Sequence, residues 1–200
     1  MSRVGIMGGT FDPIHLAHLR MARCALEQKN LGRVLFMPSK LPPHKQDKKV
    51  TDEAVRCEMV KLALEGEAGF AFSDFECRRE ETSYTARTLE LLHKAHPEDD
   101  FFFILGGDSL AYFGQWYMPG EILRYATVLA VGRGDTPVPV LQKQAEGLME
   151  SFGGRIELLT MERLAISSSM IRERIAQGKP VREFLPERVY EYIMRHGCYF

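Results

Sequence analysis

The chain has 200 residues, of which 45% are apolar and 26% are charged, a balance typical of a globular protein with a sizeable core. Its formal net charge of −1 gives no whole-molecule attraction to nucleic acid or to an anionic membrane, so any phosphate-binding charge must be local. Its apolar segments fall short of the length that spans a bilayer, and the amino terminus leads directly into a strand-like run. We therefore expect one domain over residues 1–200, without nucleic-acid or membrane partners.

The four cysteines are scattered and form no CxxC pair, which argues against a zinc site and against a disulfide framework. They are typical of reduced thiols in a cytoplasmic protein. These residues are Cys24, Cys57, Cys77 and Cys198.

The first element is an apolar run, Val4 to Met7, which predicts a buried strand. Gly8 and Gly9 then predict a tight turn whose backbone can approach a ligand closely, because a Cβ there would hold the ligand away. Asp12 is the expected N-cap of the following helix, and Pro13 suits its first position. A strand, a glycine turn and a helix N-terminus together present N–H groups to phosphate.

His15 and His18 lie three residues apart, which places both side chains on one face at the start of this helix. They could form part of a zinc site, but the sequence offers no third ligand of matching character. They could also be ordinary surface histidines. The preceding glycine turn favours an anion-binding pair instead.

Strands and helices alternate along the rest of the chain. Strands are expected at residues 4–7, 34–37, 70–75, 101–105, 127–131 and 156–159. Helices are expected from Pro13 to Asn30, from a Thr51 cap onward, over 85–96 and 138–152, from the serine run to Gly178, and from Pro186 to Gly197. This alternation predicts an α/β fold of the Rossmann-like kind, a doubly wound parallel sheet of about six strands with helices on both faces.

Glycine turns, basic residues and a serine run follow several of the predicted strands, at the sheet edge where ligands of such folds bind. These features are Gly8-Gly9-Thr10, the lysine-rich loop 39–49, Gly106-Gly107-Asp108, Gly132-Arg133, and the ISSS segment with Arg172. One site that handles several phosphates explains all of them, although the serine run could be only a helix cap and most of the lysines could be only solvated. Trp116, the single tryptophan, would by default belong to the core or to a surface patch.

Several of these segments resemble motifs of the nucleotidyltransferase superfamily. HLAH resembles its T/HxGH signature, with Ala17 where the family usually has Gly, and GGTFDPIHLAH looks most like the nicotinate-nucleotide adenylyltransferase branch. ISSSMIR is similar to the motif ISSTxIR, with Ser169 in place of threonine, and PPHK, SYT and the Trp-Tyr pair are similar to further segments of that branch.

The resemblance implies transfer of the adenylyl group of ATP to nicotinate mononucleotide, which yields deamido-NAD and pyrophosphate in NAD biosynthesis. Mg²⁺ would arrive with ATP, since the sequence has no acidic cluster that could enclose the ion. The resemblance implies catalytic roles for His15, His18, Lys45 and Arg172. It implies ATP contacts for Gly8, Gly9, Thr10, Phe11, Asp108, Arg133, Ile166, Ser167 and Ser168. Contacts to nicotinate mononucleotide would come from Ser83, Tyr84, Thr85, Trp116 and Tyr117.

Two alternatives stay open at the level of sequence. A sister adenylyltransferase acting on phosphopantetheine or nicotinamide mononucleotide would keep the histidines and the serine run, but not SYT together with the Trp-Tyr pair. A nucleotide sensor without activity would have lost a phosphate-contacting residue, and here all are present. The sequence does not decide between a monomer and a homo-oligomer.

Overall fold

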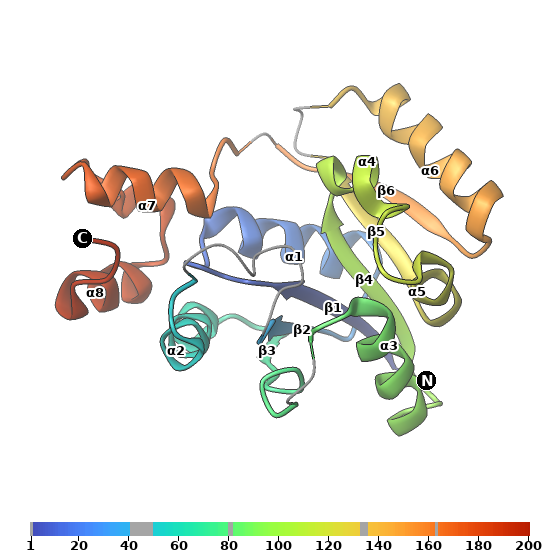
Figure 1. The fold of residues 1–200 in the computed structure, drawn as a ribbon, viewed down its shortest axis with the longest axis horizontal. Helices are drawn as coiled ribbons and strands as arrows, with labels where there is room; N and C mark the ends of the chain where they lie inside the picture. The colour runs from blue at the N-terminus through green and yellow to red at the C-terminus, as the bar shows by residue number, and fades with distance from the viewer. Residues whose placement is uncertain (1, 41–49, 80–81, 133–135, 163) are drawn as a thin grey trace.

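The computed structural model describes residues 2–40, 50–79, 82–132, 136–162 and 164–200. Its centre is a six-stranded, fully parallel sheet in the order β3-β2-β1-β4-β5-β6 (Figure 1). The strands are β1 (Arg3–Gly9), β2 (Arg33–Pro38), β3 (Phe70–Phe72), β4 (Asp100–Gly106), β5 (Thr127–Gly132) and β6 (Ile156–Thr160). This order confirms the predicted doubly wound α/β fold.

Helices cover both faces of the sheet, because the apolar residues of its strands point alternately to either side. In β4, Phe102 and Ile104 join the core beneath α1 (Leu16–Gln28), α2 (Glu53–Leu64), α7 (Ser168–Ala176) and α8 (Glu187–His196). Phe101, Phe103 and Leu105 of the same strand join the core beneath α3 (Thr85–Ala95), α4 (Leu110–Phe113), α5 (Pro119–Tyr125) and α6 (Val138–Phe152). Two 3₁₀ turns, η1 (Gly107–Ser109) and η2 (Arg182–Phe184), complete the described helices.

The direction of winding reverses between β1 and β4, which are neighbours in the sheet although about a hundred residues separate them. From β1 the chain builds outward through β2 to β3, and it then crosses back to β4 and continues outward to β6. Ligands of doubly wound sheets bind at such a switch point, beyond the carboxyl ends of the strands. A ligand-binding site is therefore expected beyond the carboxyl ends of β1 and β4.

The predicted start of the first helix was wrong. α1 begins at Leu16 and has His15, not Asp12, as its N-cap. The Asp12 carboxylate instead accepts hydrogen bonds from the Tyr199 hydroxyl and from the backbone N–H of Thr51. These partners come from distant parts of the chain, and they engage the carboxylate in place of a local capping bond.

Smaller differences concern element boundaries. Gly8 and Gly9 belong to β1, so the turn begins only at Thr10. Asp52, rather than Thr51, caps α2 by accepting from the Ala54 N–H at 2.8 Å.

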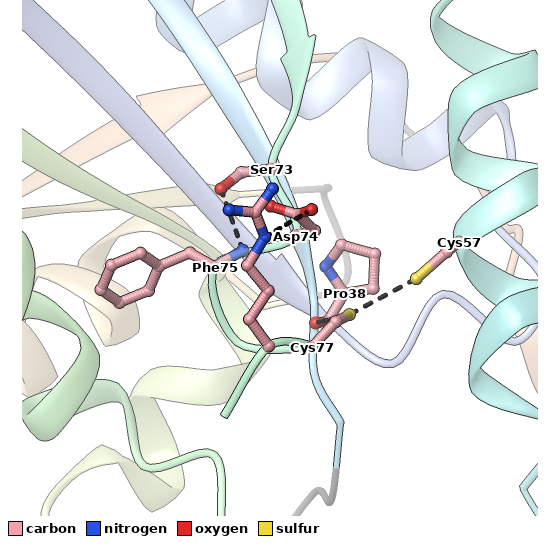
Figure 2. Close-up of polar contacts among 7 residues, drawn as sticks. Pro38, Cys57, Ser73, Asp74, Phe75 and Cys77 are labelled. Atoms are coloured by element: carbon pink, nitrogen blue, oxygen red, sulfur yellow. Dashed lines mark hydrogen bonds and ion pairs between the residues drawn. The ribbon is translucent and has the colours of Figure 1, made fainter. Parts of the chain in front are cut away.

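The third strand ends at Phe72, three residues earlier than predicted, and the chain turns just beyond it, where the Ser73 hydroxyl accepts from Phe75 N (Figure 2). The short helices α4 and α5 were not predicted. Among the described residues, no helix is both long and apolar enough to cross a membrane. All four cysteines are free thiols, as expected.

Candidate active site

Two adjoining cavities open beyond the carboxyl ends of β1 and β4. We call them the histidine cavity, of about 340 Å³, and the aromatic cavity, of about 400 Å³. Gly8, Phe103, Ser109 and Trp116 line both cavities and therefore form their common wall. A ligand with two chemically different halves could occupy both at once.

The histidine cavity brings together eight of the residues predicted for catalysis or ATP binding. These are Gly8, His15, His18, Asp108, Ile166, Ser167, Ser168 and Arg172. They come from β1, α1, the turn after β4 and the start of α7. Two helix N-termini, two imidazoles and a guanidinium at one edge of the sheet are a set that favours phosphate.

The imidazole rings of His15 and His18 are stacked, with their centroids 3.7 Å apart. The backbone N–H of His15 donates to His18 Nδ1 at 3.2 Å, so Nδ1 is an acceptor and the proton of the neutral ring lies on Nε2. The Phe11 ring meets the His18 ring edge-on at 5.1 Å, and Phe11 is itself buried. His18 is thus held in one orientation with Nε2 as its proton-bearing nitrogen.

Gly9 permits this packing of Phe11. A Cβ on Gly9 would lie 3.1 Å from two atoms of the Phe11 ring, which is closer than side chains ordinarily pack. Gly9 therefore allows Phe11 to sit beneath His18, in addition to leaving room for a ligand.

The serine helix α7 is bonded directly to the turn that precedes the histidines. Ser167 caps it by accepting from Met170 N at 3.2 Å. Ser168 Oγ donates to the Pro13 carbonyl at 2.9 Å, and Arg172 Nη1 donates to the Asp12 carbonyl at 2.6 Å. The helix cap and the anion site, which the sequence analysis treated as alternatives, are therefore compatible: α7 supports the histidine turn and also faces the cavity.

The aromatic cavity contains the residues predicted to contact nicotinate mononucleotide, namely Ser83, Tyr84, Thr85, Trp116 and Tyr117. The Tyr84 and Tyr117 rings lie 4.5 Å apart at their centroids. Trp116 is half-buried and packs on Phe113 at 5.4 Å and on Phe103 at 6.1 Å. It is therefore both part of the core and part of the cavity wall.

Among the described residues that line the aromatic cavity, Glu76 is the only charged one, and the sequence analysis missed it. Thr88 Oγ1 donates to Glu76 Oε1 at 2.8 Å, and the Ser83 hydroxyl also hydrogen-bonds the carboxylate. Burial raises the pKa of Glu76, while these two hydrogen bonds act in the opposite direction. Because Ser83 Oγ accepts from Lys40 N at 3.1 Å as well, its hydroxyl is engaged within the protein.

Polar contacts hold the turn that carries Glu76 on both sides, as Figure 2 shows for the neighbouring residues. Ser73 Oγ accepts from Phe75 N at 3.4 Å, before Glu76. After it, Cys77 Sγ lies 3.5 Å from the Pro38 carbonyl and 3.4 Å from Cys57 Sγ on α2. The position of Glu76 is thus set by β2 and α2 as well as by its own turn.

Arg56 is a second buried charged residue that the sequence analysis missed, with 1% of its surface exposed. Its guanidinium donates to the carbonyls of Thr10, Ser39 and Thr51, at 2.7, 3.0 and 2.9 Å. It therefore joins the ends of β1 and β2 to the entry of α2. Its position on a helix resembled that of any solvated arginine, so no local signal singled it out.

The remaining predicted residues are distributed as follows. Gly9 and Thr10, predicted to contact ATP, line the aromatic cavity. Phe11 lines neither cavity and supports His18 from behind. Lys45 and Arg133 lie outside the described residues.

The chain was compared with known proteins. The model of the cytidylyltransferase-like family matches residues 6–174. The probable nicotinate-nucleotide adenylyltransferase of Lachnoclostridium phytofermentans is 42% identical over 199 residues and is covered completely, as is this chain. The probable enzyme of the same name from Carboxydothermus hydrogenoformans is 37% identical, with 99% of this chain and 98% of the relative covered.

A solved structure shares the fold. The nicotinic acid mononucleotide adenylyltransferase of Plasmodium falciparum, solved in complex with NaAD, superposes with a TM-score of 0.83 at 19% identity, covering 100% of this chain and 98% of the other. At 19% identity the structural similarity shows only a shared fold, whereas the two relatives at 42% and 37% identity show the family. The chain belongs to the nicotinate-nucleotide adenylyltransferase family, within the cytidylyltransferase-like proteins.

Proposed function

We propose that this protein transfers the adenylyl group of ATP to nicotinate mononucleotide, which yields nicotinate adenine dinucleotide and pyrophosphate. One observation carries the proposal: a cavity lined by histidines, serines and Arg172 shares a wall with an aromatic cavity of about 400 Å³. The first suits the phosphates of ATP, and the second suits a flat pyridine ring. Because Gly8 and Trp116 line both cavities, substrates bound in the two cavities would lie side by side.

In the reaction, a phosphate oxygen of nicotinate mononucleotide attacks the α-phosphorus of ATP. The bond from the α-phosphorus to the bridging oxygen breaks, and pyrophosphate leaves with the electron pair. Because the attacking phosphate is already anionic, no general base or covalent residue is required. The protein's task is to position the two phosphates and to stabilise the charge that shifts towards the leaving group.

His18 is the residue best placed for that task. With the proton on Nε2, it can donate to an oxygen of the α-phosphate, and its stacking on His15 fixes the direction of that donor. Its contact strengthens as charge develops in the transition state, so it acts mainly on the rate.

Further donors complete the phosphate site. Arg172 offers a charged guanidinium from the first turns of α7, and the α7 N-terminus adds backbone N–H groups. Asp108 accepts from a ribose hydroxyl in this arrangement, and Lys45 follows from the sequence motif alone, since it lies outside the described residues.

Mg²⁺ fits this site as an ion that arrives with ATP. Among the described residues that line the histidine cavity, Asp108 is the single carboxylate, which is too few for an all-protein site. Mg²⁺ characteristically keeps several waters and binds substrate phosphates with one or two carboxylates, so such a donor set suits it. When bound, the ion would neutralise part of the phosphate charge.

On the acceptor side, Thr85 and the first N–H groups of α3 are the donors proposed for the nicotinate carboxylate, and Trp116 and Tyr117 are proposed to hold the ring. A hydroxyl and N–H groups match a carboxylate better than an amide, which favours nicotinate over nicotinamide. Ser83 supports this segment rather than contacting substrate, because Lys40 N and Glu76 engage its hydroxyl.

The test is pyrophosphate release from ATP and Mg²⁺, with nicotinate mononucleotide, nicotinamide mononucleotide and phosphopantetheine offered in parallel. We expect the highest kcat/KM with nicotinate mononucleotide. A preference for either of the other two acceptors would assign the protein to a sister activity. Nucleotide binding without pyrophosphate release from any of them would support a sensor.

A further inference from the structure

A tyrosine near the carboxyl end of the chain reaches the turn that precedes the histidines. After α8 the backbone turns sharply at Gly197 and again at Tyr199, both with positive φ. The Tyr199 ring packs against the core, and its hydroxyl lies 2.7 Å from Asp12 Oδ1, 187 residues earlier in the sequence. Figure 1 shows α7 and α8 together at one end of the molecule, beside the start of α1.

This hydrogen bond satisfies a buried carboxylate. Asp12 is only 4% exposed, and a carboxylate removed from water needs donors close by. The described structure supplies the Tyr199 hydroxyl and, at 3.4 Å, the backbone N–H of Thr51. Burial, followed by the neighbouring Asp12 charge, raises the pKa of Tyr199, so its hydroxyl stays protonated and donates.

The same turn is fixed from its other side by α7. The Asp12 carbonyl accepts from Arg172, and the Pro13 carbonyl accepts from Ser168. Two residues after Pro13 the chain reaches His15, the N-cap of α1. Anything that shifts the turn therefore shifts the imidazole pair.

We propose that Tyr199 is a positioning residue for the histidine pair. Its hydroxyl fixes the Asp12 side chain and thereby sets how the backbone enters α1, which orients His15 and His18 towards the reacting phosphate. This inference rests on the proposed adenylyl transfer, since it takes the histidines to be the residues that contact phosphate. Tyr199 itself touches no substrate in this scheme.

Tyr199→Phe removes the hydroxyl and keeps the ring. We expect kcat to fall about tenfold, because small misplacements of a donor from its transition-state geometry are costly. Both Michaelis constants should stay within about twofold, since the histidine contact is proposed to matter most in the transition state. The matched control is Tyr192→Phe on α8, whose ring packs on His196 and whose hydroxyl is not one of the donors described for Asp12. It should keep the parent kcat.

A purely structural role predicts a different result, so two further measurements accompany the kinetics. Assays run well below the melting temperature of each variant remove the effect of unfolding from kcat. Imidazole resonances of His15 and His18, followed by NMR in the protein without substrate, report the orientation of the pair. We expect these resonances to shift in Tyr199→Phe and to stay in place in Tyr192→Phe.

Asp12→Asn tests the same bond from the other side, and it keeps the inference testable should Tyr199→Phe fail to fold. If Tyr199 acts through Asp12, the double variant should lose little more kcat than Asp12→Asn alone. A parent-like kcat together with unshifted histidine resonances in Tyr199→Phe or in Asp12→Asn would overturn the inference. A double variant whose loss of kcat equals the product of the two single-variant losses would overturn it as well. If the parent protein releases no pyrophosphate at all, the proposed function fails, while the NMR comparison still decides whether Tyr199 orients the histidines.

Discussion

Thr88 donates its hydroxyl proton to the buried carboxylate of Glu76 across 2.8 Å, which joins α3 to the turn after β3. The pKa of Glu76 is raised above its ordinary value of 4.5, chiefly by burial. A carboxyl whose pKa is higher in the folded state stabilises the fold at low pH, and this stabilisation is lost as the pH rises from about 4.5 through the raised pKa.

Glu76→Gln should remove that pH dependence, because glutamine does not titrate. We expect the melting temperature of the parent, relative to the variant, to fall as the pH goes from 4.5 to about 8. Differential scanning fluorimetry at several pH values measures it, with the exposed Glu146→Gln on α6 as control. A parent-minus-variant difference that is constant or rises with pH would show that Glu76 is not the titrating group.

His18→Ala should reduce kcat by about 10²–10³-fold, the usual cost of removing one donor that stabilises charge in the transition state. ATP affinity should change little, because the contact matters most during reaction. Steady-state kinetics with both substrates, beside the exposed His96→Ala as control, measure this effect. An unchanged kcat with only a higher KM would reduce His18 to a binding residue.

Arg172→Ala should impair ATP use in two ways, since it loses the bond to the Asp12 carbonyl as well as a phosphate contact. We expect a raised KM for ATP and a lower kcat. Arg172→Lys should recover only part of both, because a fork of donors becomes a single ammonium. The control is Arg195→Ala, an exposed position on α8, and a variant of Arg172 that uses ATP like the parent would make α7 purely structural.

Trp116 needs a comparison that keeps the core filled, because the side chain packs on Phe103 and Phe113 while it lines both cavities. Trp116→Leu keeps apolar contact but has no flat ring. Since stacking on a base is worth roughly 1–3 kcal/mol, its KM for nicotinate mononucleotide should rise about tenfold, several times more than its KM for ATP.

Trp116→Phe should recover much of that loss, and the melting temperatures of both variants show how much of any effect is packing. Equal increases in the two Michaelis constants, or an unchanged nicotinate mononucleotide KM in an unstable variant, would end the stacking proposal. Binding titrations with each substrate alone give dissociation constants as an independent measure of affinity.

The strands and long helices could be predicted because their signals are local. The unbroken apolar run of β4 and the helical spacing of apolar residues in α6 are visible without any tertiary information. The short helices α4 and α5 lack that periodicity, having four and seven residues, and were missed. The Gly8-Gly9 pair predicted a turn, yet pairing with β2 keeps both residues in the sheet.

The site was predictable where residues act through motifs and not where they act through tertiary contacts. Asp12 was misassigned as a helix cap, because its partner Tyr199 is brought to it only by folding. Glu76 and Arg56 are ordinary charged residues in the sequence, and only the folded chain shows that both are buried. The role of such a buried charge depends on hydrogen-bond partners from other elements, which the sequence alone does not show.

The contact between Tyr199 and Asp12 also bears on how the protein can be handled. A polypeptide joined directly after Phe200 would begin two positions after Tyr199, whose hydroxyl meets the histidine turn, so it risks disturbing the reaction it is meant to report. The start of β1 lies at the opposite, amino edge of the sheet, where Ser2 N bonds to Asp99. Affinity tags and reporter domains are therefore better carried at the amino end of this chain.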